Sequence, residues 1–189
     1  GENIQDFDDE DDSQPAFSFE ISDPSKNYKG KTLSFWLYKI STRTSLKKFK
    51  VRGMVVRRRY SHFLWLRNQL VEDFPGCIVP PLPEKSLLGT VEKYVSSVDT
   101  KGLLEYRQRS LTKFLTRVGE HNVLQDSEAL RAFVEMKFND FEEYKKLLVF
   151  ARKRKGIEPG LLDFQQARLF ERTGKFKKAL KALKSAMLN

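Results

Sequence analysis

Residues 55–63 read VVRRRYSHF, an apolar strand that passes through three arginines and a tyrosine into a serine suited to open a helix. Three adjacent like charges repel one another, so such a cluster seldom serves stability alone. It is either a solvated strand end or part of a site for an anion. Two later features favour a pocket for a phosphorylated ligand: Lys85, which ends a proline-rich stretch, and Arg107, which lies on the apolar face of a predicted helix.

The length of 189 residues suits one domain of ordinary size with an extension. The single cysteine, Cys77, excludes an internal disulfide and favours a reducing, cytoplasmic setting. No apolar run approaches the ~20 residues that span a bilayer, and no secretory signal pattern opens the chain. We therefore expect any membrane contact to be peripheral.

The net charge of +10 is unevenly distributed. Residues 1–25 hold nine acidic side chains and no lysine or arginine, which leaves +19 (35 basic against 16 acidic) on the remainder. A body this basic attracts polyanions such as nucleic acid, anionic lipid or acidic proteins. Residues 1–14 are acidic and poor in apolar groups, so we expect a disordered tail.

Alternation of apolar side chains predicts three strands, over residues 16–22, 32–42 and 49–58. Residues 23–27 have the composition of a turn, and Gly53 suggests a bulge or a bend in the third strand. The short connections between these strands predict an antiparallel meander.

Apolar spacing of three and four residues predicts that helices follow the strands. Ser61 is the expected N-cap of the first helix and Asp126 or Ser127 that of the third. Pro75-Gly76 should end the first helix. The expected ranges are 61–74, 103–118, about 128–154 without interruption, and two short amphipathic helices after Pro159-Gly160.

Arg107 lies three residues after Leu104 and four before Leu111, so it points with the apolar stripe of its helix. An unpaired buried charge is costly, so an inward guanidinium needs a partner. That partner is either an internal carboxylate such as Glu72 or Asp73, or an oxygen of a ligand.

Residues 79–85 read VPPLPEK, a segment whose prolines hold Lys85 on a stiff backbone. The same PxxP pattern also fits an SH3-type ligand or a plain connector. Leu87 and Leu88 follow in an apolar tip, which is either core or a loop that inserts into lipid headgroups.

These motifs resemble the phox-homology (PX) domain, and the likeness is greatest to sorting nexins. RRYSHF at 58–63, the VPPLPEK segment and RQRSL at 107–111 occur in the order typical of that family, within about 16–136. The resemblance implies an α+β fold: a three-stranded antiparallel sheet packed on a helical subdomain with a Pro-rich loop, followed by an α-helical extension.

The resemblance also implies a site for phosphatidylinositol 3-phosphate. Arg59 corresponds to the arginine that binds the 3-phosphate, and Tyr60 to the aromatic residue under the inositol ring. Lys85 corresponds to the residue that faces the 1-phosphate, and Arg107 to the one that binds the ring hydroxyls. Arg58 and Ser61 are supporting candidates, and Leu87 and Leu88 fall where the family inserts into the bilayer. His62 departs from the family, which usually has aspartate there.

The implied function is non-catalytic: recruitment to the cytosolic face of early endosomes for protein sorting, with cargo or retromer-like coat proteins as partners. The expected division is a tail over 1–14, a PX domain over 15–137 and a helical extension over 138–189. The competing hypothesis is a protein-interaction adaptor that uses the Pro-rich loop and the helical tail. We expect no nucleic-acid ligand, cofactor or metal, because the residues show no stacking platform, metal set or nucleophile–base pair.

Residues 167–186 resemble one tetratricopeptide-like helical hairpin, a weak pattern when it occurs once. A single hairpin leaves one face uncovered. We therefore expect it to pack on the domain or to continue into further repeats, and a longer sorting nexin could carry a membrane-curving BAR module in that place. The abrupt end at Asn189 suggests truncation.

Overall fold

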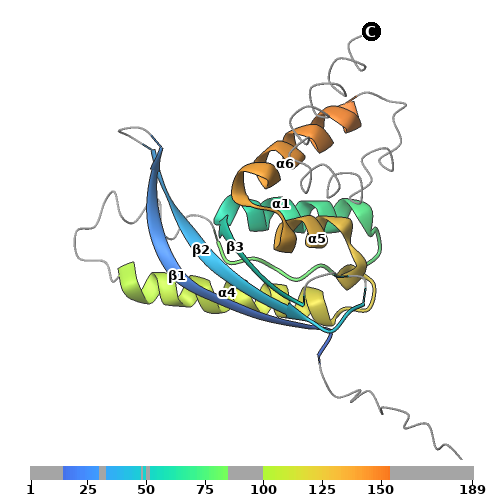
Figure 1. Cartoon of the computed structure of the whole chain (residues 1–189), viewed down its shortest axis with the longest axis horizontal. Coiled ribbons are helices and arrows are strands. Elements are labelled where there is room, and N and C mark those ends of the chain that lie inside the picture. Colours follow the sequence, from blue (N-terminus) through green and yellow to red (C-terminus); the bar gives the residue numbers. More distant parts are fainter. Residues whose placement is uncertain (1–14, 30–32, 48, 50–51, 85–99, 154–189) are drawn as a thin grey trace, which may run out of the picture. The chain divides into compact units, whose positions relative to one another are not determined.

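The computed structural model describes residues 15–29, 33–47, 49, 52–84 and 100–153 (Figure 1). The chain divides into two compact units, Gly1–Glu135 and Met136–Asn189, and each is described by itself. The predicted tail, Lys85, the Leu87-Leu88 tip and the C-terminal hairpin lie outside the described residues.

A three-stranded antiparallel sheet forms one layer of the first unit, in the order β1 (Phe17–Lys29), β2 (Leu33–Thr44), β3 (Gly53–Arg59). The predicted meander is confirmed. Its register pairs Ile21 with Ile40 and Ile40 with Val56, which places three β-branched side chains in a row across the sheet. All three are buried, so this row is part of the core.

The strands differ from the prediction at residues 23–27, where we expected a turn, and in part at Gly53. β1 continues through residues 23–27, because the sheet absorbs the irregularity as a register shift between Ser22 and Ser25. Asp23 lies there with φ 48°, a conformation that aspartate tolerates better than most residues. At Gly53, where we expected a bulge or a bend, there is no bulge, since Gly53 pairs with Arg43 in regular register, but the chain bends at the preceding residue, Arg52.

Helices cover the sheet of the first unit. In Figure 1, α4 runs along β1, and α1 and α5 lie against β3. These helices and one 3-10 turn are α1 (Tyr60–Asp73), α4 (Thr100–Glu120), η1 (Leu124–Asp126) and α5 (Glu128–Glu135). An α+β fold with a small antiparallel sheet and a helical subdomain is therefore confirmed.

Two helix ends test the predicted caps. Ser127 caps α5, since its Oγ accepts hydrogen bonds from the backbone N–H groups of Ala129 (3.1 Å) and Leu130 (3.4 Å). Ser61 does not cap α1: the N-cap is Arg59, in extended conformation (φ −98°, ψ 162°), and Ser61 is already inside the first turn. The prediction of Ser61 as N-cap was wrong because β3 runs directly into the helix, so that the N-cap lies two residues before the serine.

The long helix predicted to run to about residue 154 is two helices, α5 and α6 (Phe138–Lys153). No proline or glycine marks the break. The chain leaves the helical path at Met136, and the Lys137 carbonyl starts α6 by accepting a hydrogen bond from the Phe141 amide (2.9 Å). Local propensity therefore did not reveal this boundary.

Gly119 lets α4 approach the sheet closely. A Cβ at this position would lie 2.8 Å from Phe19 Cε2 and 2.9 Å from Phe17 Cβ, so even alanine would force the helix and strand apart. Further along the same helix, the Gln108 side chain donates a hydrogen bond to the Ile21 carbonyl (3.3 Å). These contacts hold α4 against β1 and so set the position of Arg107.

In the second unit, α6 carries two ion pairs at i,i+3 spacing, Lys145–Glu142 (3.0 Å) and Lys146–Glu143 (2.6 Å). Phe141 and Tyr144 are its buried aromatic residues. Over the part of the chain that the structure describes, no helix is long and apolar enough to cross a bilayer.

Candidate functional site: the end of β3 and the proline-rich segment

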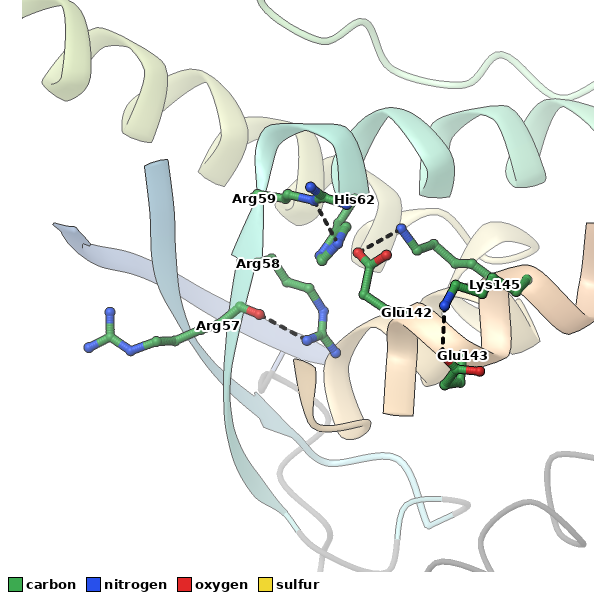
Figure 2. Close-up of polar contacts among 8 residues, drawn as sticks. Arg57, Arg58, Arg59, His62, Glu142, Glu143 and Lys145 are labelled. Atoms are coloured by element: carbon green, nitrogen blue, oxygen red, sulfur yellow. Dashed lines mark hydrogen bonds and ion pairs between the residues drawn. The ribbon is translucent and has the colours of Figure 1, made fainter. Parts of the chain in front are cut away.

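The three consecutive arginines at the end of β3 have three different environments (Figure 2). Arg57 is exposed and points outward, where it bonds to the Asp23 carboxylate and to Ser25 Oγ (3.0 Å) on β1. Arg58 is completely buried, and Arg59 is partly buried at the start of α1. The alternation of a strand separates neighbouring side chains, so one cluster of charge becomes three distinct features.

Arg58 ties β3 to α5. Its Nε donates to the Phe133 carbonyl (2.9 Å), its Nη1 donates to the Arg57 carbonyl (2.9 Å), and its guanidinium lies 5.4 Å from the centre of the Phe133 ring. A charge with no solvent exposure is tolerated when hydrogen bonds satisfy it. These contacts give Arg58 a structural role and do not favour the supporting role in ligand binding that we expected for it.

Arg59 is held on two sides by neighbouring side chains. Its guanidinium carbon lies 5.3 Å from the centre of the Phe35 ring, and its Nε donates to His62 Nε2 (3.2 Å). Figure 2 shows Arg59 and His62 turned toward one another at the start of α1. The first turn of α1 contains no acidic residue, so the positive end of the helix dipole adds to the charge of Arg59.

Tyr60 joins the helix start to the proline-rich segment, since its hydroxyl donates a hydrogen bond to the Pro83 carbonyl. Burial raises the pKa of Tyr60 above its ordinary value, although the charges of Arg107 and Arg67 oppose this shift. The phenol is therefore protonated at physiological pH and remains a donor to Pro83.

The carbonyl groups of the proline-rich segment accept hydrogen bonds from two helices. Arg67 of α1 donates to the Pro80 carbonyl (3.2 Å), and Arg107 of α4 donates to the Glu84 carbonyl (3.1 Å). With the Tyr60–Pro83 bond, three donors fix residues 80–84. Lys85 follows directly in sequence but lies outside the described residues, as do Leu87 and Leu88.

Arg107 is buried, with 6% of its surface exposed, as its position on the apolar stripe predicted. Its guanidinium carbon lies 4.9 Å from the centre of the Tyr60 ring, a cation–π distance. Its charge also opposes the raised pKa that burial gives to the buried Tyr38. Arg109, two residues later on the same helix, is exposed, so the two arginines of the RQRSL segment differ in burial.

The structure thus brings together three of the four predicted headgroup residues. Arg59 and Tyr60 are adjacent at the junction of β3 and α1, and Arg107 stacks on Tyr60 from α4. The fourth, Lys85, lies beyond the described residues, and Ser61 is exposed on the first turn of α1. Cationic groups next to an aromatic ring can bind a phosphate and cover the C–H face of a sugar ring.

Three contributors were not predicted as part of the site: Phe35, Arg67 and His62. Phe35 and Arg67 belong to elements whose periodicity predicts only a strand or a helix, and nothing in their spacing points to Arg59 or to the Pro80 carbonyl. His62 was noticed only as a departure from the family pattern. Among the described residues, no group of three or more histidine, cysteine or acidic side chains is arranged to hold a metal ion.

Comparison with known proteins gives the class to which this geometry belongs. The PX domain family model matches residues 46–137, which include the end of β3, the proline-rich segment and α4. This chain belongs to the PX domain family.

Within that family, the chain is related to the sorting nexins. It is 38% identical over 123 residues to Sorting nexin 1 of Arabidopsis thaliana, which covers 65% of this chain and 29% of that protein. It is 38% identical to mouse Sorting nexin-7 over 114 residues (60% and 28%) and 34% identical to mouse Sorting nexin-30 over 141 residues (74% and 31%). The chain therefore spans less than a third of the length of these curated relatives.

A solved structure also aligns with the chain, an X-ray structure of a designed CISK-PX domain. Its TM-score is 0.48 at 31% sequence identity, and the alignment covers 63% of this chain and 99% of that one. The PX domain match includes Arg59, Tyr60 and Arg107, so these three residues of the candidate site lie within the matched region.

Proposed function

We propose that this chain binds phosphatidylinositol 3-phosphate and thereby recruits its protein to the cytosolic face of early endosomal membranes for protein sorting. The observation that carries this proposal is that Arg107 of α4 lies against Tyr60, next to Arg59, although α4 is far from these two residues in the sequence. In the proposed complex, Arg59 binds the 3-phosphate, Tyr60 covers the inositol ring, and Arg107 bonds to the ring hydroxyls.

Two further groups complete the proposed site. Lys85 faces the 1-phosphate, and its place directly after the fixed residues 80–84 supports this role. Leu87 and Leu88 insert into the lipid layer beside the headgroup, where each buried CH₂ contributes about 0.8 kcal/mol. One pocket with two inserted leucines binds weakly, so recruitment relies on avidity in the whole protein.

The proposed division of the chain is a lipid-binding domain over 15–137 and a helical extension over 138–189 that adds contacts to cargo or retromer-like coat proteins. The alternative, an adaptor that offers the Pro-rich loop to another protein, has less support. Pro83 is buried, and the carbonyls of Pro80 and Pro83 already accept internal hydrogen bonds. A polyproline ligand must expose such groups to its partner.

Liposome sedimentation with the full chain tests the proposal. Phosphatidylcholine vesicles carry one of the seven phosphoinositides at equal mole fraction, and the fraction of protein pelleted is measured. We expect selective pelleting with the 3-monophosphate, loss of it in Arg59→Ala and Arg107→Ala, and a reduction in Leu87→Asp. Arg109→Ala is the matched control, because it removes an exposed arginine from the same helix.

Two results would contradict the proposal. Equal pelleting with every phosphoinositide would show attraction by charge alone, without a headgroup site. Selective pelleting that survives Arg59→Ala and Arg107→Ala would place the site elsewhere on the chain. Binding of cargo that is insensitive to both arginine substitutions, with no lipid selectivity, would favour the adaptor.

A further inference from the structure

His62 is a fully buried histidine at the start of α1, the third residue of that helix. Its Nε2 accepts the hydrogen bond from Arg59 Nε at 3.2 Å (Figure 2). Because an imidazole nitrogen that accepts a hydrogen bond carries no proton, this bond requires an unprotonated Nε2 and therefore the neutral ring. A histidine that points at solvent would not be held in this way.

The Arg59–His62 bond joins two side chains at the start of α1 and is not a helix cap, because a guanidinium cannot accept from the free N–H groups of the first turn. Arg59 is the N-cap residue, and its side chain makes no capping hydrogen bond to the backbone of the first turn. Its side chain instead reaches the residue three positions later, which is on the same face one turn on. The backbone of Arg59 is anchored as well, because it pairs with Leu37 in the sheet.

The bond uses the Nε–H donor of Arg59. With Nε bonded to His62 and one face over Phe35, the long side chain is restrained along its length. A phosphate would then be met by the end of the guanidinium, through Nη1 and Nη2, which is a bidentate geometry. Restraining a rotamer-rich side chain before binding removes an ordering cost that the ligand would otherwise meet.

We propose that His62 is a positioning residue for the phosphate site: its neutral Nε2 holds Arg59 Nε and aims the guanidinium at a phosphate monoester of the headgroup. His62 does not touch the ligand and acts only through Arg59. The inference rests on the proposed function, since it assigns the positioning of a residue in that same site.

The test compares His62→Leu, which has no acceptor, with His62→Gln, whose Oε1 can accept from Arg59. The probes are phosphatidylcholine vesicles that contain phosphatidylinositol 3-phosphate and the soluble headgroup inositol 1,3-bisphosphate. An ordering cost of one long side chain corresponds to about a three- to tenfold change in affinity. We expect His62→Leu to weaken binding of both probes by that factor and His62→Gln to remain within about twofold of the natural chain.

A double-substitution cycle shows whether His62 acts through Arg59. Lysine has no Nε–H donor, so in an Arg59→Lys background the change His62→Leu should have no further effect on affinity. The ¹⁵Nε–¹Hε signal of Arg59, identified by its loss in Arg59→Lys, should exchange slowly with solvent in the natural chain and faster in His62→Leu. Neither readout moves if the histidine only fills space.

Thermal unfolding of each variant identifies a general loss of fold, and His62→Gln keeps the inference testable if His62→Leu does not fold. Equal affinity of His62→Leu and the natural chain would overturn the inference, as would the same loss in His62→Leu and His62→Gln when both are folded. Undiminished binding by Arg59→Lys and Arg59→Ala would instead overturn the proposed function itself. The two failures are therefore distinguishable.

Discussion

The two ends of β3 both carry arginine, but they hold it differently. At the Arg59 end, the guanidinium is restrained by Phe35 and His62, and a second guanidinium, that of Arg107, lies against Tyr60. At the other end, an open pocket of about 590 Å³ is lined by Arg43 and Arg52 together with Pro15, Ser18, Thr44, Ser45 and Gly53. Among the described residues, neither of these two guanidinium groups has a hydrogen-bond or ion-pair partner, although the Arg52 carbonyl accepts a bond from the Thr44 amide (3.0 Å).

This difference distinguishes a general attraction for anions from the recognition of one particular ligand. Unrestrained arginines attract any anion, and salt screens that attraction. Restrained arginines favour a ligand of one geometry, and less side-chain entropy is lost when that ligand binds. The seven residues of β3 at about 3.3 Å each place the two ends roughly 20 Å apart, more than twice the screening length of about 8 Å at 0.15 M salt. The two ends should therefore act independently under physiological conditions.

The largest expected effect is at the restrained end. Arg59→Gln should lower affinity for vesicles containing phosphatidylinositol 3-phosphate about ten- to a hundredfold, since a hydrogen-bonded contact to a charged group contributes about 1.5–3 kcal/mol. The paired variant Arg43→Gln/Arg52→Gln removes two charges at the open end and should change this affinity less than about twofold at 0.15 M salt. Sedimentation isotherms measure both affinities. Equal losses of affinity in the two variants would show that the two ends of β3 do not differ in ligand recognition.

The next effect is on stability and concerns the neighbour of Arg59. Arg58→Met should lower the free energy of unfolding by about 1–3 kcal/mol, because it leaves the buried Phe133 carbonyl without its donor. Arg57→Met is the control: it removes an exposed pair with Asp23, which contributes less than about 1 kcal/mol. Urea unfolding measures both. If Arg58→Met were as stable as the natural chain and bound lipid less well, Arg58 would belong to the ligand site.

A smaller effect is expected at the link between the restrained end and the proline-rich segment. Tyr60→Phe removes the hydrogen bond to the Pro83 carbonyl and should cost about 0.5–1.5 kcal/mol of unfolding free energy, with a modest loss of headgroup affinity. Tyr106→Phe is the matched control, since Tyr106 is 48% exposed on α4. A Tyr60→Phe variant indistinguishable from Tyr106→Phe in both measurements would show that this link does not support the site.

The smallest effect is expected at the open end and depends on salt. At 0.01 M ionic strength the screening length grows to about 30 Å, longer than β3, so the two ends should no longer be independent. Arg43→Gln/Arg52→Gln should then weaken binding to phosphatidylserine vesicles, and the loss should vanish at 0.15 M. A loss that persists at 0.15 M would mean that the open end contacts the membrane directly.

Much of the fold could be predicted from local patterns. Alternation of apolar side chains predicted the three strands, and their short connections predicted the antiparallel order. The apolar stripe of α4 predicted that Arg107 points inward. The strands and the inward side chain both follow from side-chain periodicity, which is a property of the backbone geometry itself. The predictions for the turn at 23–27, for Ser61 and for an unbroken helix to about residue 154 were wrong, because sheet pairing and packing overrode local propensity at each place.

For this protein, residue order alone was sufficient for the elements, for the family resemblance and for the identity of the headgroup candidates, because each depends on near neighbours in the chain. Only the folded chain shows that the three consecutive arginines differ. Arg57 forms a surface ion pair, Arg58 is buried and bonded to α5, and Arg59 is restrained by neighbouring side chains. It also joined Arg59 to Phe35, and Arg107 to Tyr60 and the Glu84 carbonyl. These contacts link residues far apart in sequence, and the packing of strands and helices, not the periodicity of any one of them, decides which side chains meet.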